Sequence, residues 1–84
     1  MNYVYTLKQS NSQLYIGSTK NLKRRIREHA LGKVAATKPH QPCQLIYYEA
    51  YLNEKDARSR EQYLKTGDGR QALKKQLQHL LMRS

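Results

Sequence analysis

The stretch Leu14–His29 constrains the fold most, because a strand pattern gives way to a helical pattern inside it. Its first three residues are aromatic or large and apolar, which is typical of a β-strand. Gly17 interrupts this run and tolerates any φ, so we expect it to end the strand in a structural turn that another group can approach closely. A helix should follow over Asn21–Leu31 and stop at Gly32, a residue suited to helix ends.

The apolar spacing of this helix predicts which of its faces is buried. Leu22 and Ile26 are four residues apart and Ala30 continues the stripe, as on the inner face of an amphipathic helix. Arg25 and His29 fall on or beside the same face. The other charged residues fall on the opposite side: Lys23, Arg24, Arg27 and Glu28. An inward arginine and histidine therefore indicate more than solubility.

A second strand pattern, Tyr3–Leu7, precedes this stretch, and turn-forming residues separate the two. Residues 2–18 should therefore form an antiparallel hairpin. A two-residue turn at Asn11–Ser12 would place Tyr5 and Tyr15 on opposite sheet faces, whereas a loop with an odd number of residues, such as Ser10–Ser12, would place them on the same face. Cooperation between the two hydroxyls requires the odd loop or a bulge.

The middle of the chain should hold a loop and a third strand. Residues 33–43 contain two prolines and no clear period, so we expect a loop with one helical turn around Val34–Thr37. Gln44–Tyr51 is bulky and almost continuously apolar. This pattern favours a strand at a central or well-covered position.

Two helices should complete the chain. Asn53 is a good cap for the first, Ala57 and Leu64 mark its inward face with Glu61 between them, and Gly67 should end it. An inward carboxylate needs a cation or hydrogen bonds to keep its charge. For the last helix, Asp68 and Gln71 form the capping-box pattern, followed by an apolar stripe of Leu73, Leu77, Leu80 and Leu81.

The order strand, strand, helix, strand, helix, helix predicts an α+β fold with a small three-stranded antiparallel sheet flanked by helices. Eighty-four residues form one domain, 1–84, and bury only about 60–65% of the unfolded surface. The single Cys43 excludes an internal disulfide, and no Cys/His cluster has zinc-site spacing.

The net charge of +10 predicts an anionic partner, either nucleic acid or a membrane surface. Ribosomal and chromatin proteins carry similar charge, so composition does not separate binding from catalysis. Neither a signal sequence nor a membrane-spanning apolar run is present, so we expect a cytoplasmic protein, compatible with a bacterial nucleoid and without a membrane partner.

Several segments together resemble one nuclease family. They are Tyr3-Val4-Tyr5, Tyr15-Ile16-Gly17, Lys20-Asn21-Leu22 with Arg25, and Glu61. This set is similar to the GIY-YIG endonuclease superfamily, and closest to its small stand-alone members, which are similar to the N-terminal nuclease domain of excinuclease C. The resemblance covers the chain from Tyr3 to about Leu81.

The resemblance implies a divalent-metal-dependent endonuclease that hydrolyses DNA phosphodiester bonds in repair or processing. Glu61 would hold one Mg²⁺ or Mn²⁺ ion and Arg25 would contact a phosphate oxygen. Tyr5 would be the base and Tyr15 its positioning partner, with Arg25, His29 and the metal lowering the pKa of the phenol. The DNA backbone would be bound by Lys20, Lys23, Arg24 and Arg27.

Two departures from the family pattern bear on activity. Ser18 stands where many members carry a lysine, and no asparagine follows Glu61 in Gly67–Leu73. A non-catalytic nucleic-acid-binding module is therefore the alternative. A basic ribosome-associated protein would explain the charge but not the inward Arg25 and Glu61. RNA stays open as a substrate, and the sequence does not specify the oligomeric state.

Overall fold

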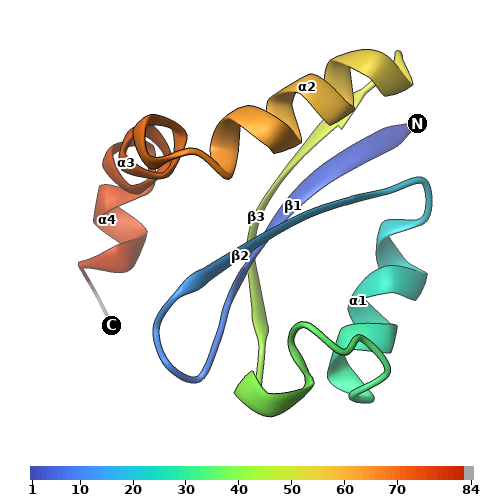
Figure 1. The fold of residues 1–84 in the computed structure, drawn as a ribbon, viewed down its shortest axis with the longest axis vertical. Helices are drawn as coiled ribbons and strands as arrows, with labels where there is room; N and C mark the ends of the chain where they lie inside the picture. Colours follow the sequence, from blue (N-terminus) through green and yellow to red (C-terminus); the bar gives the residue numbers. More distant parts are fainter. Residues whose placement is uncertain (83–84) are drawn as a thin grey trace.

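The computed structural model describes residues 1–82 and contains one antiparallel sheet with helices on both of its faces (Figure 1). The strands are β1 (Asn2–Lys8), β2 (Leu14–Thr19) and β3 (Gln44–Tyr51), in the order β2-β1-β3. The helices are α1 (Leu22–Ala30), a 3₁₀ turn η1 (Lys38–His40), α2 (Glu54–Leu64), α3 (Gly67–Gln76) and α4 (Gln78–Leu81). The predicted α+β class and the order of strands and helices along the chain are confirmed. The last two residues of the predicted domain lie outside the described part.

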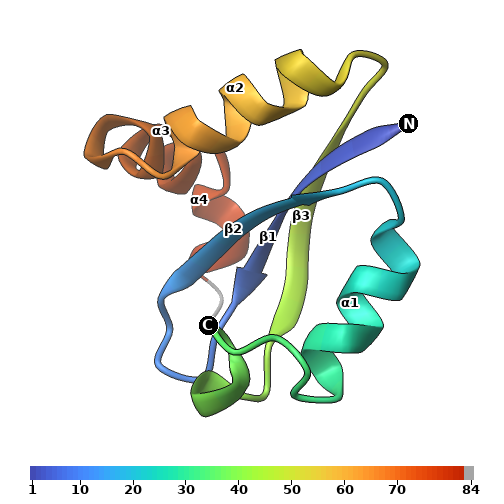
Figure 2. The ribbon, with the colours of Figure 1, turned by 45° about the vertical axis from the view of Figure 1, so that its right-hand side comes forward.

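The apolar core lies on one face of the sheet, which we call the α2 face. Val4, Leu14 and Ile16 project from this face. They pack against three buried residues of the C-terminal helices, Ala57, Leu64 and Leu73. Figures 1 and 2 show α2, α3 and α4 on this side, with α1 on the other side, the α1 face.

The hairpin register confirms the odd loop. Lys8 pairs with Leu14, so five residues, 9–13, connect the strands. Tyr5 pairs with Gly17 and Leu7 pairs with Tyr15, which places both tyrosines on the α1 face because directly paired residues project to the same side.

Two strand predictions are wrong. β2 continues through Gly17 to Thr19, so this glycine lies inside a strand and forms no turn. β3 lies at an edge, since β1 occupies the centre of the sheet, and none of the residues of β3 is fully buried. Two of its tyrosines, Tyr47 and Tyr51, are only partly buried, and the hydroxyl of each donates a hydrogen bond to the carboxylate of Glu49.

Helix α1 closely matches its predicted range. Asn21 caps it by accepting a hydrogen bond from the Arg24 backbone N–H at 3.0 Å, and Gly32 adopts φ 73° just beyond its end. Ala30 is exposed, so the inner stripe does not extend to it. The turn expected around residues 34–37 is present, since the Val34 carbonyl accepts from the Thr37 and Lys38 N–H groups at 3.1 and 2.9 Å. The 3₁₀ turn η1 follows it directly at Lys38–His40.

The C-terminal helices differ more from the prediction. Asn53 caps α2 as expected, but α2 ends at Leu64, before Gly67. The cap of α3 is Thr66, whose hydroxyl accepts from the Gly69 N–H, rather than Asp68. The predicted last helix also divides at Leu77 into α3 and α4. Among residues 1–82, no helix has the length and apolar character needed to cross a bilayer.

Candidate active site

A buried tyrosine–histidine pair lies at the centre of the α1 face. The Tyr5 hydroxyl is 2.8 Å from His29 Nε2, and both side chains are 1% exposed. His29 Nδ1 is 2.7 Å from Thr37 Oγ1, which itself lies 3.5 Å from the Val34 carbonyl. If Thr37 donates to that carbonyl, His29 must donate from Nδ1 and accept the Tyr5 proton at Nε2.

Tyr15 completes a cluster of three rings. Its ring centroid is 6.4 Å from that of Tyr5 and 5.2 Å from that of His29, and the Tyr5 and His29 centroids are 5.5 Å apart. The two contacts with His29 are edge-to-face and the contact between the tyrosines is tilted; edge-to-face contacts hold aromatic rings in defined orientations. Tyr15 is only half-buried, so of the two tyrosines it is the one that solvent or a ligand can reach.

Burial controls the protonation of the central pair. It raises the pKa of Tyr5 to about 12, despite a hydrogen bond from Arg25 that acts to lower it. Burial also lowers the pKa of His29, and the nearby charge of Arg25 acts in the same direction. Arg25 acts to lower the pKa of Tyr5, in the expected direction, but burial outweighs it, so the phenol stays protonated and the imidazole neutral near pH 7.

Arg25 lies beside this cluster, half-buried, with two partners. Its guanidinium lies close enough to the Tyr5 hydroxyl to act on the pKa of that phenol, and it pairs with Glu28 Oε1 at 3.0 Å. Glu28 therefore reaches inward to Arg25, although its spacing predicts the outer side of the helix. One acceptor of the guanidinium fork is a neighbouring carboxylate, which a phosphate oxygen could replace.

Gly17 makes room for Tyr5. A Cβ atom at position 17 would lie 2.5 Å from the Tyr5 hydroxyl oxygen and 2.6 Å from Cζ. The Tyr5 ring therefore lies directly against the β2 backbone. The glycine serves close approach, as the sequence suggests, but inside a strand rather than at a turn.

Glu61 approaches from α2, on the other layer. Ser18 Oγ donates to Glu61 Oε1 at 2.7 Å and Lys65 Nζ pairs with Oε2 at 2.9 Å. Burial acts to raise the pKa of Glu61, but the hydrogen bonds from Lys65 and Ser18 outweigh it and lower the pKa, so the carboxylate is charged. The charge of Glu61 also acts to raise the pKa of Tyr5, so the carboxylate is within electrostatic range of the ring cluster.

The structure thus brings the predicted residues together at two neighbouring places. Tyr5, Tyr15, Arg25 and His29 form the cluster on the α1 face, and Gly17 lies against it. Glu61 is held beside it by Ser18, the residue after Gly17. Within residues 1–82, no group of three or more His, Cys, Asp or Glu side chains is placed to hold a metal ion.

The predicted DNA-binding residues are all exposed. They lie on α1 and on the loop before it: Lys20, Lys23, Arg24 and Arg27. Lys20 pairs with Glu54 at 3.2 Å, with both side chains largely in solvent. Such a pair is weak, so a phosphate can compete for the lysine.

Sequence reasoning misses four supporting residues. Glu28 and Lys65 are detectable as i+3 and i+4 neighbours of Arg25 and Glu61. Ser18 stands out in the sequence only as a departure from the family pattern, and its bond to Glu61 crosses 43 positions. No local signal identifies Thr37 as the partner of His29.

Comparison with known proteins agrees with this geometry. The GIY-YIG catalytic domain family matches residues 1–75. The chain is 46% identical over 66 residues to a UPF0213 protein of Clostridium perfringens, covering 77% of this chain and 71% of that protein. It is 40% identical over 73 residues to a UPF0213 protein of Staphylococcus haemolyticus, covering 86% and 89%.

A solved structure shows the same fold. The solution NMR structure of a UPF0213 protein from Bacillus halodurans superposes with a TM-score of 0.56 at 31% identity, covering 87% of this chain and 82% of that one. The hairpin, ring cluster and glutamate define a GIY-YIG domain, and the chain belongs to the GIY-YIG family. Its relatives named UPF0213 place it within a stand-alone group of that family.

Proposed function

We propose that this protein is a divalent-metal-dependent endonuclease that hydrolyses phosphodiester bonds in DNA. The observation that carries the proposal is the cluster of Tyr5, Tyr15 and His29, with Tyr5 packed against Gly17 and with Arg25 and a charged Glu61 within electrostatic range of Tyr5. These are the residues that the sequence resemblance assigns to the site, and the family match over residues 1–75 supports that assignment.

Glu61 fits a single magnesium or manganese ion. Mg²⁺ keeps several waters and binds proteins through one or two carboxylates plus substrate phosphates, so one acidic ligand suffices. The carboxylate is charged and oriented by Ser18, while Lys65 would have to release Oε2. When bound, such an ion supplies charge neutralisation at a phosphate and an acidified water.

Arg25 would bind the scissile phosphate in the same site. Its guanidinium is directed toward Tyr5 and held by Glu28, so its donors are already positioned. Preorganised donors contribute most where negative charge develops, as on the oxygens of a phosphate under attack. Exchange of Glu28 for a phosphate oxygen keeps the arginine paired throughout.

The roles of the two tyrosines follow from their burial. A phenol with a pKa of about 12, whose hydroxyl is already engaged by His29 and Arg25, is a poor base. We therefore assign Tyr5 to positioning Arg25 and Tyr15, and Tyr15 to orienting the attacking water. His29 holds Tyr5 in place through the buried hydrogen bond between its Nε2 atom and the Tyr5 hydroxyl.

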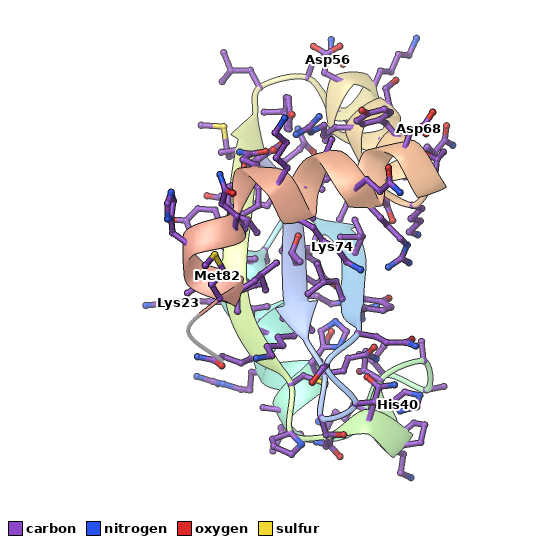
Figure 3. The ribbon with its side chains drawn as sticks, turned by 90° about the vertical axis from the view of Figure 1, so that its left-hand side faces the viewer. Lys23, His40, Asp56, Asp68, Lys74 and Met82 are labelled. Carbon is purple, nitrogen blue, oxygen red and sulfur yellow. The ribbon has the colours of Figure 1, made fainter. Side chains whose placement is uncertain are left out.

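The test is a cleavage assay on supercoiled, branched and single-stranded DNA, and on RNA, with Mg²⁺ or Mn²⁺. Glu61→Gln keeps the shape of the side chain and its bond to Ser18 but removes the charge, so cutting should fall by at least about 100-fold. Asp56→Asn is the matched control, because Asp56 lies on the same helix at the outer surface (Figure 3). It should cut like the wild-type protein.

Two results would contradict the proposal. Unchanged cutting by Glu61→Gln would exclude Glu61 as the metal ligand. DNA binding without cutting of any substrate by the wild-type protein would favour the binding module, which keeps the fold and the basic surface. Broadening of the Ser18 amide signal by Mn²⁺ in NMR spectra, lost in Glu61→Gln, reports metal binding independently of activity.

A further inference from the structure

A groove runs along the α1 face beside the ring cluster. Its volume is about 490 Å³, and its lining includes Tyr3, Tyr48, Lys20, Lys23 and Ile26. The groove lies between the beginning of α1 and the β1–β3 pair. Of these two strands, β1 also carries Tyr5 of the candidate active site. None of the residues to which we assign a catalytic or metal-binding role lines it, so the proposed reaction does not explain it.

The wall of the groove is an exposed aromatic ring on an edge strand. Tyr48 is 53% exposed, which is unusual for a large ring. Tyr3 contacts it edge-on, with ring centroids 6.1 Å apart, and so holds the ring upright. One side of the Tyr48 ring is therefore supported while the ring stays accessible from the groove.

The rim of the groove is cationic. Lys20 and Lys23 both contribute to it, and Lys23 projects past the β3 edge of the sheet in Figure 3. Within the described residues 1–82, Lys20 forms an ion pair with the exposed Glu54. Proteins that bind single-stranded nucleic acid use this arrangement of an aromatic ring next to lysines. A base stacks on the ring and a neighbouring phosphate binds the cation.

The register places this ring next to the active site. Tyr48 pairs directly with Tyr5 across the β1–β3 ladder. Directly paired residues have Cα atoms about 4.5–5.5 Å apart. Tyr48 and Tyr5 therefore project to the same face from neighbouring strands. A base on Tyr48 would lie on the face of the sheet where Arg25 would hold the phosphate.

We propose that this groove is a stacking subsite in which Tyr48 holds an unpaired base of a single-stranded DNA segment next to the scissile phosphate. A paired base in a duplex is covered on both sides by its neighbours, so it cannot stack on the ring. The subsite therefore selects single strands, flaps or loops over continuous duplex. The inference rests on the proposed nuclease function and adds its substrate class.

The test measures binding by fluorescence anisotropy with EDTA present, so that no strand is cut. The ligands are a labelled single strand of about 12 nucleotides and the same sequence paired as a duplex. Tyr48→Thr removes the ring and puts in its place a β-branched residue that is favoured in strands. It should weaken single-strand binding by about 10-fold or more, while duplex binding should change by less than about 2-fold. Tyr48→Phe should retain wild-type affinity for both ligands.

Tyr63→Ala is the matched control, because Tyr63 is similarly exposed but lies on α2 in the other layer. It should bind both ligands like the wild-type protein. Circular dichroism of each variant confirms that the sheet is intact. The binding assay contains no metal, so it can be interpreted even if the protein cuts no DNA. Likewise, if Tyr48→Thr leaves both binding affinities unchanged, the result of the cleavage assay still stands.

Three outcomes would overturn the subsite. Tyr48→Thr could bind single strands as well as the wild-type protein does, or it could lose affinity equally for single strand and duplex. Sedimentation could instead show a dimer of the wild-type protein that Tyr48→Thr dissociates, which would assign the groove to a second copy of the chain.

Discussion

Replacing Gly17 by alanine tests the central geometric claim about the site. The new Cβ would lie 2.5 Å from the Tyr5 hydroxyl oxygen, inside van der Waals contact. Tyr5 cannot simply swing away, because its side chain is fully buried and its hydroxyl is bonded to His29. Either the β2 backbone shifts or the tyrosine–histidine bond breaks.

The magnitude follows from these two costs. Overpacking a buried site costs about 1–3 kcal/mol, and leaving a buried hydrogen-bond partner unpaired costs about 1–3 kcal/mol. The reduced entropy of the unfolded chain offsets about 0.4–1 kcal/mol. Because either response relieves the clash, only one of the two costs applies, and we expect the free energy of unfolding to fall by about 1–2 kcal/mol. For a domain of this size that lowers the Tm by about 4–16 °C.

Urea and thermal unfolding followed by circular dichroism measure this change. Gly67→Ala is the matched control, since no other described atom lies within 4 Å of a Cβ there, and its stability should change by less than about 1 kcal/mol. In a Tyr5→Leu background, Gly17→Ala should cost much less, because the clashing hydroxyl and ring are gone. Equal Tm values for Gly17→Ala and Gly67→Ala, or strictly additive effects in the double variant, would refute the close-approach argument.

Three further predictions concern stability. Thr6→Val should raise the Tm by about 4–8 °C, because the buried Thr6 hydroxyl has no hydrogen-bond partner among the described residues; a lower Tm would mean that the hydroxyl is satisfied. Thr66→Ala should cost about 1 kcal/mol in urea unfolding, whereas Asp68→Ala should cost under about 0.5 kcal/mol, since Thr66 and not Asp68 caps α3; the reverse order would restore the sequence prediction. Glu49→Gln should destabilise the protein most above pH 4.5 and progressively less below it. Burial acts to raise the pKa of Glu49, but Arg60 and the two tyrosine hydroxyls outweigh it and lower the pKa, so this stability is present above the unfolded pKa of 4.5 and is lost as the carboxylate protonates. A difference between the two proteins that does not change with pH, in unfolding curves measured from pH 3 to 7, would contradict this assignment.

The sequence by itself determined the local elements. The hairpin, helix α1 with its Asn21 cap, strand β3 and the start of α2 all appear at or near their predicted positions. Each depends on side-chain periodicity and capping within a few residues, which act the same way in any tertiary context. The odd-loop requirement also came from local geometry, since side chains alternate along every strand.

The tertiary structure decided where those elements lie. The bulky, apolar residues of β3 favour a central position, but only the pairing of β1 with both partners shows that β3 is an edge. The shift of the α3 cap to Thr66 likewise depends on packing, since Gly69 lets the start of α3 approach the Tyr63 carbonyl closely. Position in a layer is a long-range property that no local pattern records.

The site shows the same division. Motif spacing selected Tyr5, Tyr15, Arg25, His29 and Glu61, and the structure gathers them around the β2 strand. Their chemistry was not readable, because a pKa depends on desolvation and on partners distant in sequence. The sequence therefore determined which residues are available to the candidate site. Only the tertiary structure decided that burial raises the pKa of Tyr5 and that Ser18 hydrogen-bonds Glu61.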